Sequence, residues 1–208
     1  MELFRPTGIN ELKLVFDTKM ETWPPRLPEQ PIFYPVTNFP YAAQIAKEWN
    51  STTSEYVGYV TKFNVDDEYI SQFEKKVVGG QQHEELWIPA EELEEFNKNI
   101  TEKIEVVSSY FGDNFTGLMP DKCILKGKSV NEQFVSLASI LAYNGMDFHC
   151  EITANSSFIF LHYPYWESKE FNTKNLSGYS KEEVLNAIKK VWGSAYPDIK
   201  LPMQMQQA

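Results

Sequence analysis

Val57-Gly58-Tyr59-Val60-Thr61-Lys62-Phe63-Asn64-Val65 is the stretch that decides the fold of this 208-residue chain. It is rich in aromatic and β-branched residues, which favour a β-strand. Working outward from it, similar short runs predict further strands near residues 2–5, 32–34, 84–88 and 104–107. Apolar residues at helical spacing predict helices after Gly8, over residues 41–49 and after Pro89. This order predicts an α+β fold with a split, mostly antiparallel sheet and flanking helices.

The segment from Phe111 to Gly117 is the expected boundary between a first domain, 1–117, and a second, 118–208. Two capping boxes, Ser129 with Glu132 and Ser180 with Glu183, each predict the start of a helix. Between them, residues 147–153 and 158–163 flank a polar stretch and predict a β-hairpin. We therefore expect a small helix–hairpin–helix unit. Its expected contacts with the first domain are Phe134, Leu137, Ile188 and Trp192.

Charge and composition narrow the range of partners. The formal net charge is −10, which repels a phosphate backbone, so nucleic acid is not expected as a partner. No apolar run approaches the roughly 20 residues that span a bilayer, and the first residues do not resemble a secretory signal. We therefore expect a cytoplasmic protein with no membrane association. The two cysteines are too few for a disulfide framework, and His149 beside Cys150 has no identifiable partners for a metal site.

The strand that begins at His83 carries acidic and aromatic residues at alternating positions. Leu86 and Ile88 share one of its faces, which we expect to be the core face. Glu85 and Trp87 then point the other way, toward a cleft, with His83 on the same side. The spacing therefore selects Glu85 as the carboxylate of a candidate site.

The order of elements over residues 2–110 resembles the ADP-ribosyltransferase fold. In that fold an Arg or His on the first strand, an aromatic or hydroxyl residue on the second and a Glu on a later strand converge on NAD. The chain also resembles a family of bacterial proteins labelled ADP-ribosylation/crystallin. The matching stretches are Leu3-Phe4-Arg5-Pro6, Pro24-Pro25-Arg26-Leu27-Pro28, Pro31-Ile32-Phe33-Tyr34-Pro35 and Glu85-Leu86-Trp87-Ile88-Pro89-Ala90-Glu91-Glu92-Leu93.

The resemblance implies an NAD-dependent ADP-ribosyltransferase that uses NAD as a substrate and passes ADP-ribose to an unidentified acceptor. Glu85 would be the catalytic acid, within reach of Arg5 and Tyr34, because a carboxylate stabilises the oxocarbenium-like state of glycosidic cleavage. Arg5 and Arg26 would hold the pyrophosphate. The residues implied in NAD binding are Arg5, Arg26, Tyr34, Thr37, His83 and Trp87. Some transferases carry Gln or Glu where this chain has His83, which argues against an Arg-directed activity.

Structural roles stay open for several of these residues. Arg5 could form a salt bridge, Tyr34 could fill the core, Thr37 could belong to a turn, and Arg26 could pack in its proline-rich loop. Two other functions also stay open. One is a binding or adaptor module that keeps the fold without the activity, and the other is an acidic, immunity-type inhibitor of a basic protein partner.

Overall fold

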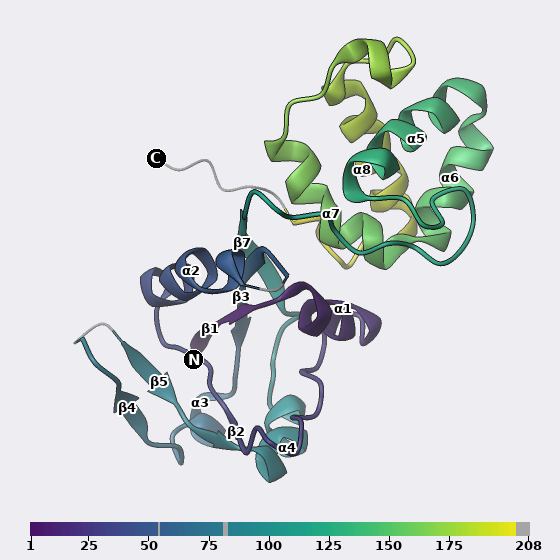
Figure 1. The fold of residues 1–208 in the computed structure, drawn as a ribbon. Helices are drawn as coiled ribbons and strands as arrows, with labels where there is room; N and C mark the ends of the chain where they lie inside the picture. Colours follow the sequence, from purple (N-terminus) through teal and green to yellow (C-terminus); the bar gives the residue numbers. More distant parts are fainter. Residues whose placement is uncertain (54, 81–82, 203–208) are drawn as a thin grey trace. The chain divides into compact units, whose positions relative to one another are not determined.

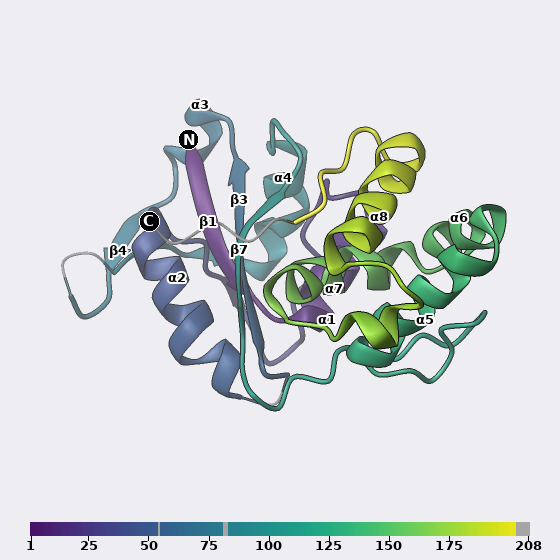
Figure 2. The ribbon, with the colours of Figure 1, turned by 90° about the horizontal axis from the view of Figure 1, so that it is seen from above.

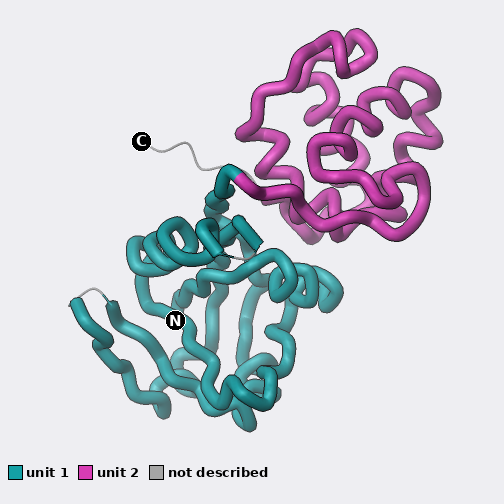
Figure 3. The backbone as a smooth tube through the Cα atoms, viewed as in Figure 1, with its two compact units in different colours: residues 1–113 teal, residues 114–208 magenta. Residues whose placement is uncertain are grey.

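The computed structural model describes residues 1–53, 55–80 and 83–202, and the chain divides into two compact units (Figure 3). Unit 1 comprises residues 1–113 and unit 2 residues 114–208, so the division lies inside the expected boundary segment. Unit 1 contains β1 (Glu2–Thr7), α1 (Ile9–Asp17), β2 (Ile32–Phe33), α2 (Phe39–Glu48), η1 (Asn50–Thr52), β3 (Val57–Asn64), α3 (Asp67–Ile70), β4 (Lys75–Val77), β5 (Glu84–Leu86), β6 (Ile88–Pro89), η2 (Ala90–Glu92), α4 (Leu93–Lys98) and β7 (Glu105–Phe111).

Strand β3 is the centre of a three-stranded sheet in the order β1-β3-β7 (Figure 1). Both of its pairings are antiparallel, with Leu3 opposite Phe63 and Arg5 opposite Thr61. Two shorter antiparallel pairs, β2 with β6 and β4 with β5, complete the strands of the described residues. The α+β class and the antiparallel pairing are therefore confirmed, and each strand expected in residues 1–113 is present.

Helix α2 covers one face of this sheet (Figures 1 and 2). Phe4 and Val60 on that face pack with Tyr41 and Ala46 of the helix. Gly58 permits the approach, because a Cβ there would lie 2.1 Å from the backbone oxygen of Ala46. The sheet and helix therefore meet at backbone distance, which explains the glycine inside an otherwise bulky strand.

The opposite face of the sheet carries the aromatic core of unit 1. The ring of Phe63 lies 5.3 Å from that of Trp23 and 6.1 Å from that of Phe96. Phe33 of β2 joins them, 5.4 Å from Trp23. Residues 3, 5 and 7 of β1 project toward this face, since Leu3 pairs with Phe63 and side chains alternate along a strand.

The backbone at Val36 joins the β4–β5 ribbon to β1. Val36 forms antiparallel bridges with Phe4 on one side and with Glu85 on the other. Paired residues of antiparallel strands project to the same face. Phe4, Val36 and Glu85 therefore share the face that α2 covers, and this geometry positions the candidate site.

The regular elements in the described residues of unit 2 are all helices, so the expected β-hairpin is wrong. Its elements are α5 (Val130–Tyr143), α6 (Gly145–Ala154), α7 (Ser156–Ser168), η3 (Thr173–Leu176) and α8 (Lys181–Ala195). The residues expected as two strands lie in α6 and α7. The side chains from Ile159 to Trp166 are all buried, so α7 has no polar stripe to reveal its helical period. Both capping boxes are confirmed, at Ser129 and at Ser180.

The core of unit 2 is built by its own helices. Phe134 lies 5.5 Å from Trp166, and Trp192 lies 6.1 Å from Phe160, as measured between ring centroids. Leu137 and Ile188 are buried as well. The four residues expected to contact the first domain are thus part of the interior of unit 2.

A buried histidine fixes the loop that leads into α5. His162 Nε2 accepts a hydrogen bond from the Leu118 backbone N–H at 3.0 Å, and its Nδ1 lies 2.8 Å from Gln133 Oε1. Burial lowers the pKa of His162 to about 3, so the ring is neutral and donates through Nδ1. This network has a structural role, since both ring nitrogens are occupied.

Candidate functional site

The Glu85 carboxylate is held by two neutral donors on the α2 side of the sheet. Its Oε1 accepts a hydrogen bond of 2.9 Å from the Tyr41 hydroxyl, and its Oε2 accepts one of 3.1 Å from Trp87 Nε1. Burial, together with the neighbouring carboxylate, raises the pKa of Tyr41 to about 12, so the hydroxyl stays protonated and donates at neutral pH. Glu85 forms no ion pair within the described residues, and it is partly exposed.

Aromatic rings surround this carboxylate. The Tyr34 ring meets the Trp87 ring edge to face at 5.5 Å, and the His83 ring stacks on Tyr41 at 4.2 Å. Lys76, opposite Glu85 in the ribbon, places its Nζ 4.0 Å from the centre of the Trp87 ring. We call Tyr34, Tyr41, His83, Glu85 and Trp87 the Glu85 cluster. Three of the sequence-predicted residues thus meet Glu85 itself or its direct neighbours.

Local backbone structure sets these positions. Alternation along β5 and its continuation places Glu85 and Trp87 on one face, while Leu86 and Ile88 are buried on the other, as the sequence predicts. Asn38 caps α2 by accepting a hydrogen bond from the Tyr41 N–H, which fixes the start of the helix. Thr37 lies one residue earlier, and both its N–H and its hydroxyl donate to the Glu84 carbonyl. Thr37 therefore holds β5 in place instead of facing the cluster.

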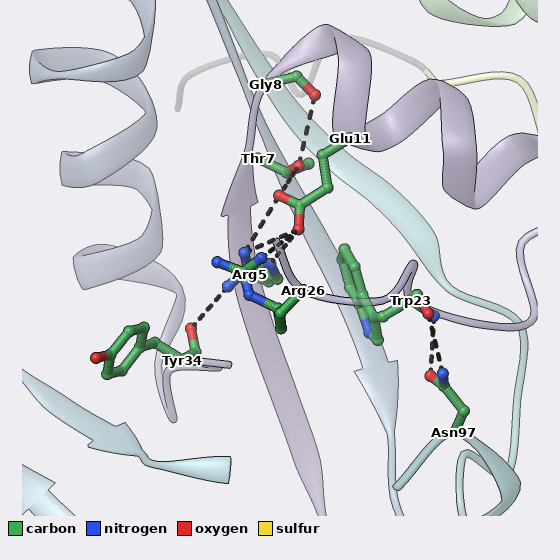
Figure 4. A network of polar contacts seen from close by, with 8 residues as sticks. All are labelled: Arg5, Thr7, Gly8, Glu11, Trp23, Arg26, Tyr34 and Asn97. Carbon is green, nitrogen blue, oxygen red and sulfur yellow. Dashed lines mark hydrogen bonds and ion pairs between the residues drawn. The ribbon is translucent and has the colours of Figure 1, made fainter. Parts of the chain in front are cut away.

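Arg5 lies in a different environment, on the aromatic side of the sheet (Figure 4). Its side chain is almost fully buried, and its guanidinium donates to both carboxylate oxygens of Glu11, the shortest contact being 2.9 Å. It also lies 4.5 Å from the centre of the Phe33 ring and donates to the Tyr34 carbonyl. The structural alternative for Arg5, a surface or interface salt bridge, is thus observed in part: Arg5 forms a salt bridge, but a buried one.

Glu11 neutralises a second cation as well. Arg26 Nη1 lies 3.2 Å from Glu11 Oε1, and the Thr7 hydroxyl donates to Oε2 at 2.7 Å. Burial alone would raise the pKa of Glu11, but Arg5, the Thr7 hydrogen bond and Arg26 together lower it below its usual range. Both arginines implied in pyrophosphate binding therefore converge on one internal carboxylate.

The structure does not bring Arg5 and Glu85 together. Glu85 shares the face of Phe4 through the Val36 bridges, and Arg5 follows Phe4 directly, so its side chain projects to the opposite face. Tyr34 separates the two environments, because its carbonyl contacts Arg5 whereas its ring contacts Trp87. The expected convergence of Arg5 with Glu85 is therefore wrong. The alternation of faces within β5 could not predict that Arg5 and Glu85 lie apart, because which residues of two strands share a face depends on how the strands pair.

Two cavities are bordered by residues other than the predicted site residues. One of about 250 Å³ in unit 1 is bordered by Thr7, Glu11 and Glu55. Glu55 accepts hydrogen bonds from the Ile9 N–H and from the Asn10 side chain, so both carboxylates of this cavity are engaged. A second, of about 500 Å³, lies in unit 2 between the start of α5 and the loop after α7.

Sequence reasoning missed three residues of these sites: Tyr41, Lys76 and Glu11. Tyr41 and Glu11 lie on helices, and nothing in a helix pattern reports which strand residue it meets. Lys76 belongs to β4, a short strand with no apolar alternation. In the described part of the chain, no group of three His, Cys, Asp or Glu residues is arranged to hold a metal ion.

No protein-family model, curated protein or solved structure matches this chain. Among the helices of residues 1–53, 55–80 and 83–202, none combines the length and apolar character that crossing a bilayer requires. The functional argument therefore depends on the Glu85 cluster itself.

Proposed function

We propose that unit 1 binds NAD⁺ by its nicotinamide end at the Glu85 cluster and transfers ADP-ribose to an acceptor. One observation carries the proposal: the Glu85 carboxylate is held by two neutral donors among aromatic rings, with no ion pair in the described residues. The nicotinamide ring of NAD⁺ is flat and positively charged. Aromatic faces and an uncompensated carboxylate are the groups that attract such a ring.

The main contribution of the protein to the reaction is this negative charge. The bond between ribose C1′ and the pyridinium nitrogen breaks, and nicotinamide leaves as a neutral ring with the electron pair of that bond. The acceptor's nucleophilic atom then bonds to C1′ and loses its proton. Positive charge grows on the ribose before that bond forms, and a nearby carboxylate stabilises it. Glu85 would supply this charge.

The two arginines implied in pyrophosphate binding, Arg5 and Arg26, are not placed to bind the phosphates of an NAD⁺ held at the Glu85 cluster. Arg5 and Arg26 are already paired with Glu11, and Arg5 lies on the other face of the sheet. Other donors must therefore hold the phosphates. The same observation favours a second candidate, in which the cluster binds its ligand without cleaving it and unit 1 acts as a binding module of the same ADP-ribosyltransferase-like fold.

Substitution of Glu85 by Gln separates the two functions. The amide can accept from Trp87 Nε1 through its oxygen and donate to the Tyr41 oxygen through its nitrogen, so the hydrogen bonds can survive while the charge is lost. For a transferase we expect calorimetric binding of NAD⁺ to change less than tenfold and nicotinamide release to fall about a hundredfold or more.

The neighbouring Glu84→Gln variant is the matched control. Glu84 faces away from the cluster and pairs with Lys75 at 3.3 Å on the surface. This variant should release nicotinamide at nearly the wild-type rate. Equal losses in the two variants would contradict the assignment of Glu85. Binding of NAD⁺ by the wild type without any nicotinamide release would leave the binding module as the function.

A further inference from the structure

We propose that Lys76 is a built-in competitor for the cation that the Glu85 cluster binds, and so sets the affinity of the cluster for cationic rings. The proposal rests on the proposed function for the location of the ring, and it adds a residue that controls specificity. Its ligand class is a flat organic cation, of which the pyridinium ring of NAD⁺ is one.

The position of the Lys76 ammonium is the first step. In the β4–β5 ribbon, Lys76 is paired with Glu85, and the two side chains project to the same face. The ammonium nevertheless forms no ion pair with that carboxylate and lies 4.0 Å from the centre of the Trp87 ring. A cation on the face of Trp is attracted by the ring quadrupole. The protein's own lysine thus occupies a cation position on this ring.

The second step concerns what a ligand would meet there. Trp87 donates its Nε1–H to Glu85, so the carboxylate lies at the edge of the indole and leaves the ring faces for stacking. The Tyr34 ring lies perpendicular to that of Trp87, with the two ring centres 5.5 Å apart. A flat cation that stacks on the face of Trp87 occupied by Lys76 must displace the ammonium, because the two positive charges repel each other at contact distance.

The third step predicts selectivity. A neutral ring is not repelled by the ammonium, whereas a cationic ring is. Removing only the charge of Lys76 should therefore favour cationic over neutral rings. Lys76→Met does this, because methionine is also a long, unbranched side chain and can still cover the face of Trp87.

The experiment uses the full chain and two probes that differ by one methyl group and one charge, 1-methylnicotinamide and nicotinamide. Binding is followed by NMR at the Trp87 indole N–H, which reports on the ring itself. We expect Lys76→Met to bind 1-methylnicotinamide about fivefold more tightly than the wild type does, and nicotinamide with unchanged affinity. Lys75→Met is the control, since it removes the same charge from the same strand but from the ion pair with Glu84. It should change either affinity by less than twofold.

Two results would overturn the proposal: equal gains for Lys76→Met and Lys75→Met, or no binding of 1-methylnicotinamide to Lys76→Met. The proposed function fails separately. If Lys76→Met gains affinity for 1-methylnicotinamide while no variant releases nicotinamide from NAD⁺, the cation site stands and the transferase does not. If the wild type cleaves NAD⁺ and the two lysine variants bind the cationic probe equally, the transferase stands and the role of Lys76 does not.

Discussion

Glu11 links two arginines of unit 1 through one carboxylate. It is the shared partner of two buried guanidinium groups, and the Thr7 hydroxyl adds a hydrogen bond to it (Figure 4). Glu11→Gln leaves both cations without a counter-charge. We expect the free energy of unfolding in urea to fall by about 3 kcal/mol, the usual effect of breaking a buried pair.

Acid should reproduce part of this loss, because the folded-state pKa of Glu11 is lowered. A lowered pKa stabilises the fold above the unfolded-state value of 4.5, and this contribution disappears as the pH falls through the folded-state pKa. Stability of the wild type should therefore decline below about pH 4.5 more steeply than that of Glu11→Gln. Asp17→Asn on the same helix, which breaks the exposed pair with Lys13, should cost no more than about 0.5 kcal/mol. A comparable loss in both variants would contradict the central role of Glu11.

At the scale of elements, the contact of α2 with β3 depends on a missing side chain. A Cβ on Gly58 would lie 2.1 Å from the Ala46 carbonyl oxygen, and backbone cannot rotate away as a side chain can. Gly58→Ala must therefore push α2 off the sheet. We expect a loss of about 2 kcal/mol or more in the free energy of unfolding, measured by urea denaturation.

Gly193 is the control for Gly58, because an alanine there is expected to have the opposite effect in the same assay. Gly193 lies within α8 and is exposed, and a Cβ at this position would meet no heavy atom of the described residues within 4 Å. Gly193→Ala should stabilise the chain by about 0.5 kcal/mol through helix propensity alone. If both alanine variants destabilise the protein, or if neither does, then the close approach of α2 to β3 is not what excludes a side chain at position 58.

At the scale of the whole molecule, the two units differ in charge. Residues 1–113 contain ten Lys and Arg against twenty Asp and Glu, whereas residues 114–208 contain nine of each. The entire net charge of −10 therefore resides in unit 1. An acidic surface attracts cations, which agrees with the ligand class proposed for the Glu85 cluster.

Because unit 2 has its own core, we expect a fragment of residues 114–208 to fold by itself. Phe134, Leu137, Phe160, Trp166, Ile188 and Trp192 are all buried among helices of this unit. The fragment should show a helical circular dichroism spectrum, dispersed amide resonances and one cooperative urea transition followed by its two tryptophans. A disordered spectrum at neutral pH would show that unit 2 needs unit 1 to fold.

The sequence by itself determined the strands of unit 1 other than β4, the α+β class, the two capping boxes and the face on which Glu85 and Trp87 lie. Each of these follows from a local pattern: β-branched and aromatic runs, alternation, or a Ser and a Glu three residues apart. Helix α7 was missed for a local reason too, because a helix buried on nearly all sides has the same apolar run as a buried strand.

Only the tertiary structure decided what each charged residue does. Arg5 and Glu85 both lie on strands with correctly predicted faces, yet the bridges of Val36 place them on opposite sides of the sheet. Arg5 meets Glu11 locally, across the turn between β1 and α1. Glu85 meets Tyr41, by contrast, because α2 covers its side of the sheet, and Lys76 meets Trp87 because β4 pairs with β5. Periodicity gives the face of a residue within its own element, whereas its partner depends on which elements pair, and that is decided by contacts between residues far apart in the sequence.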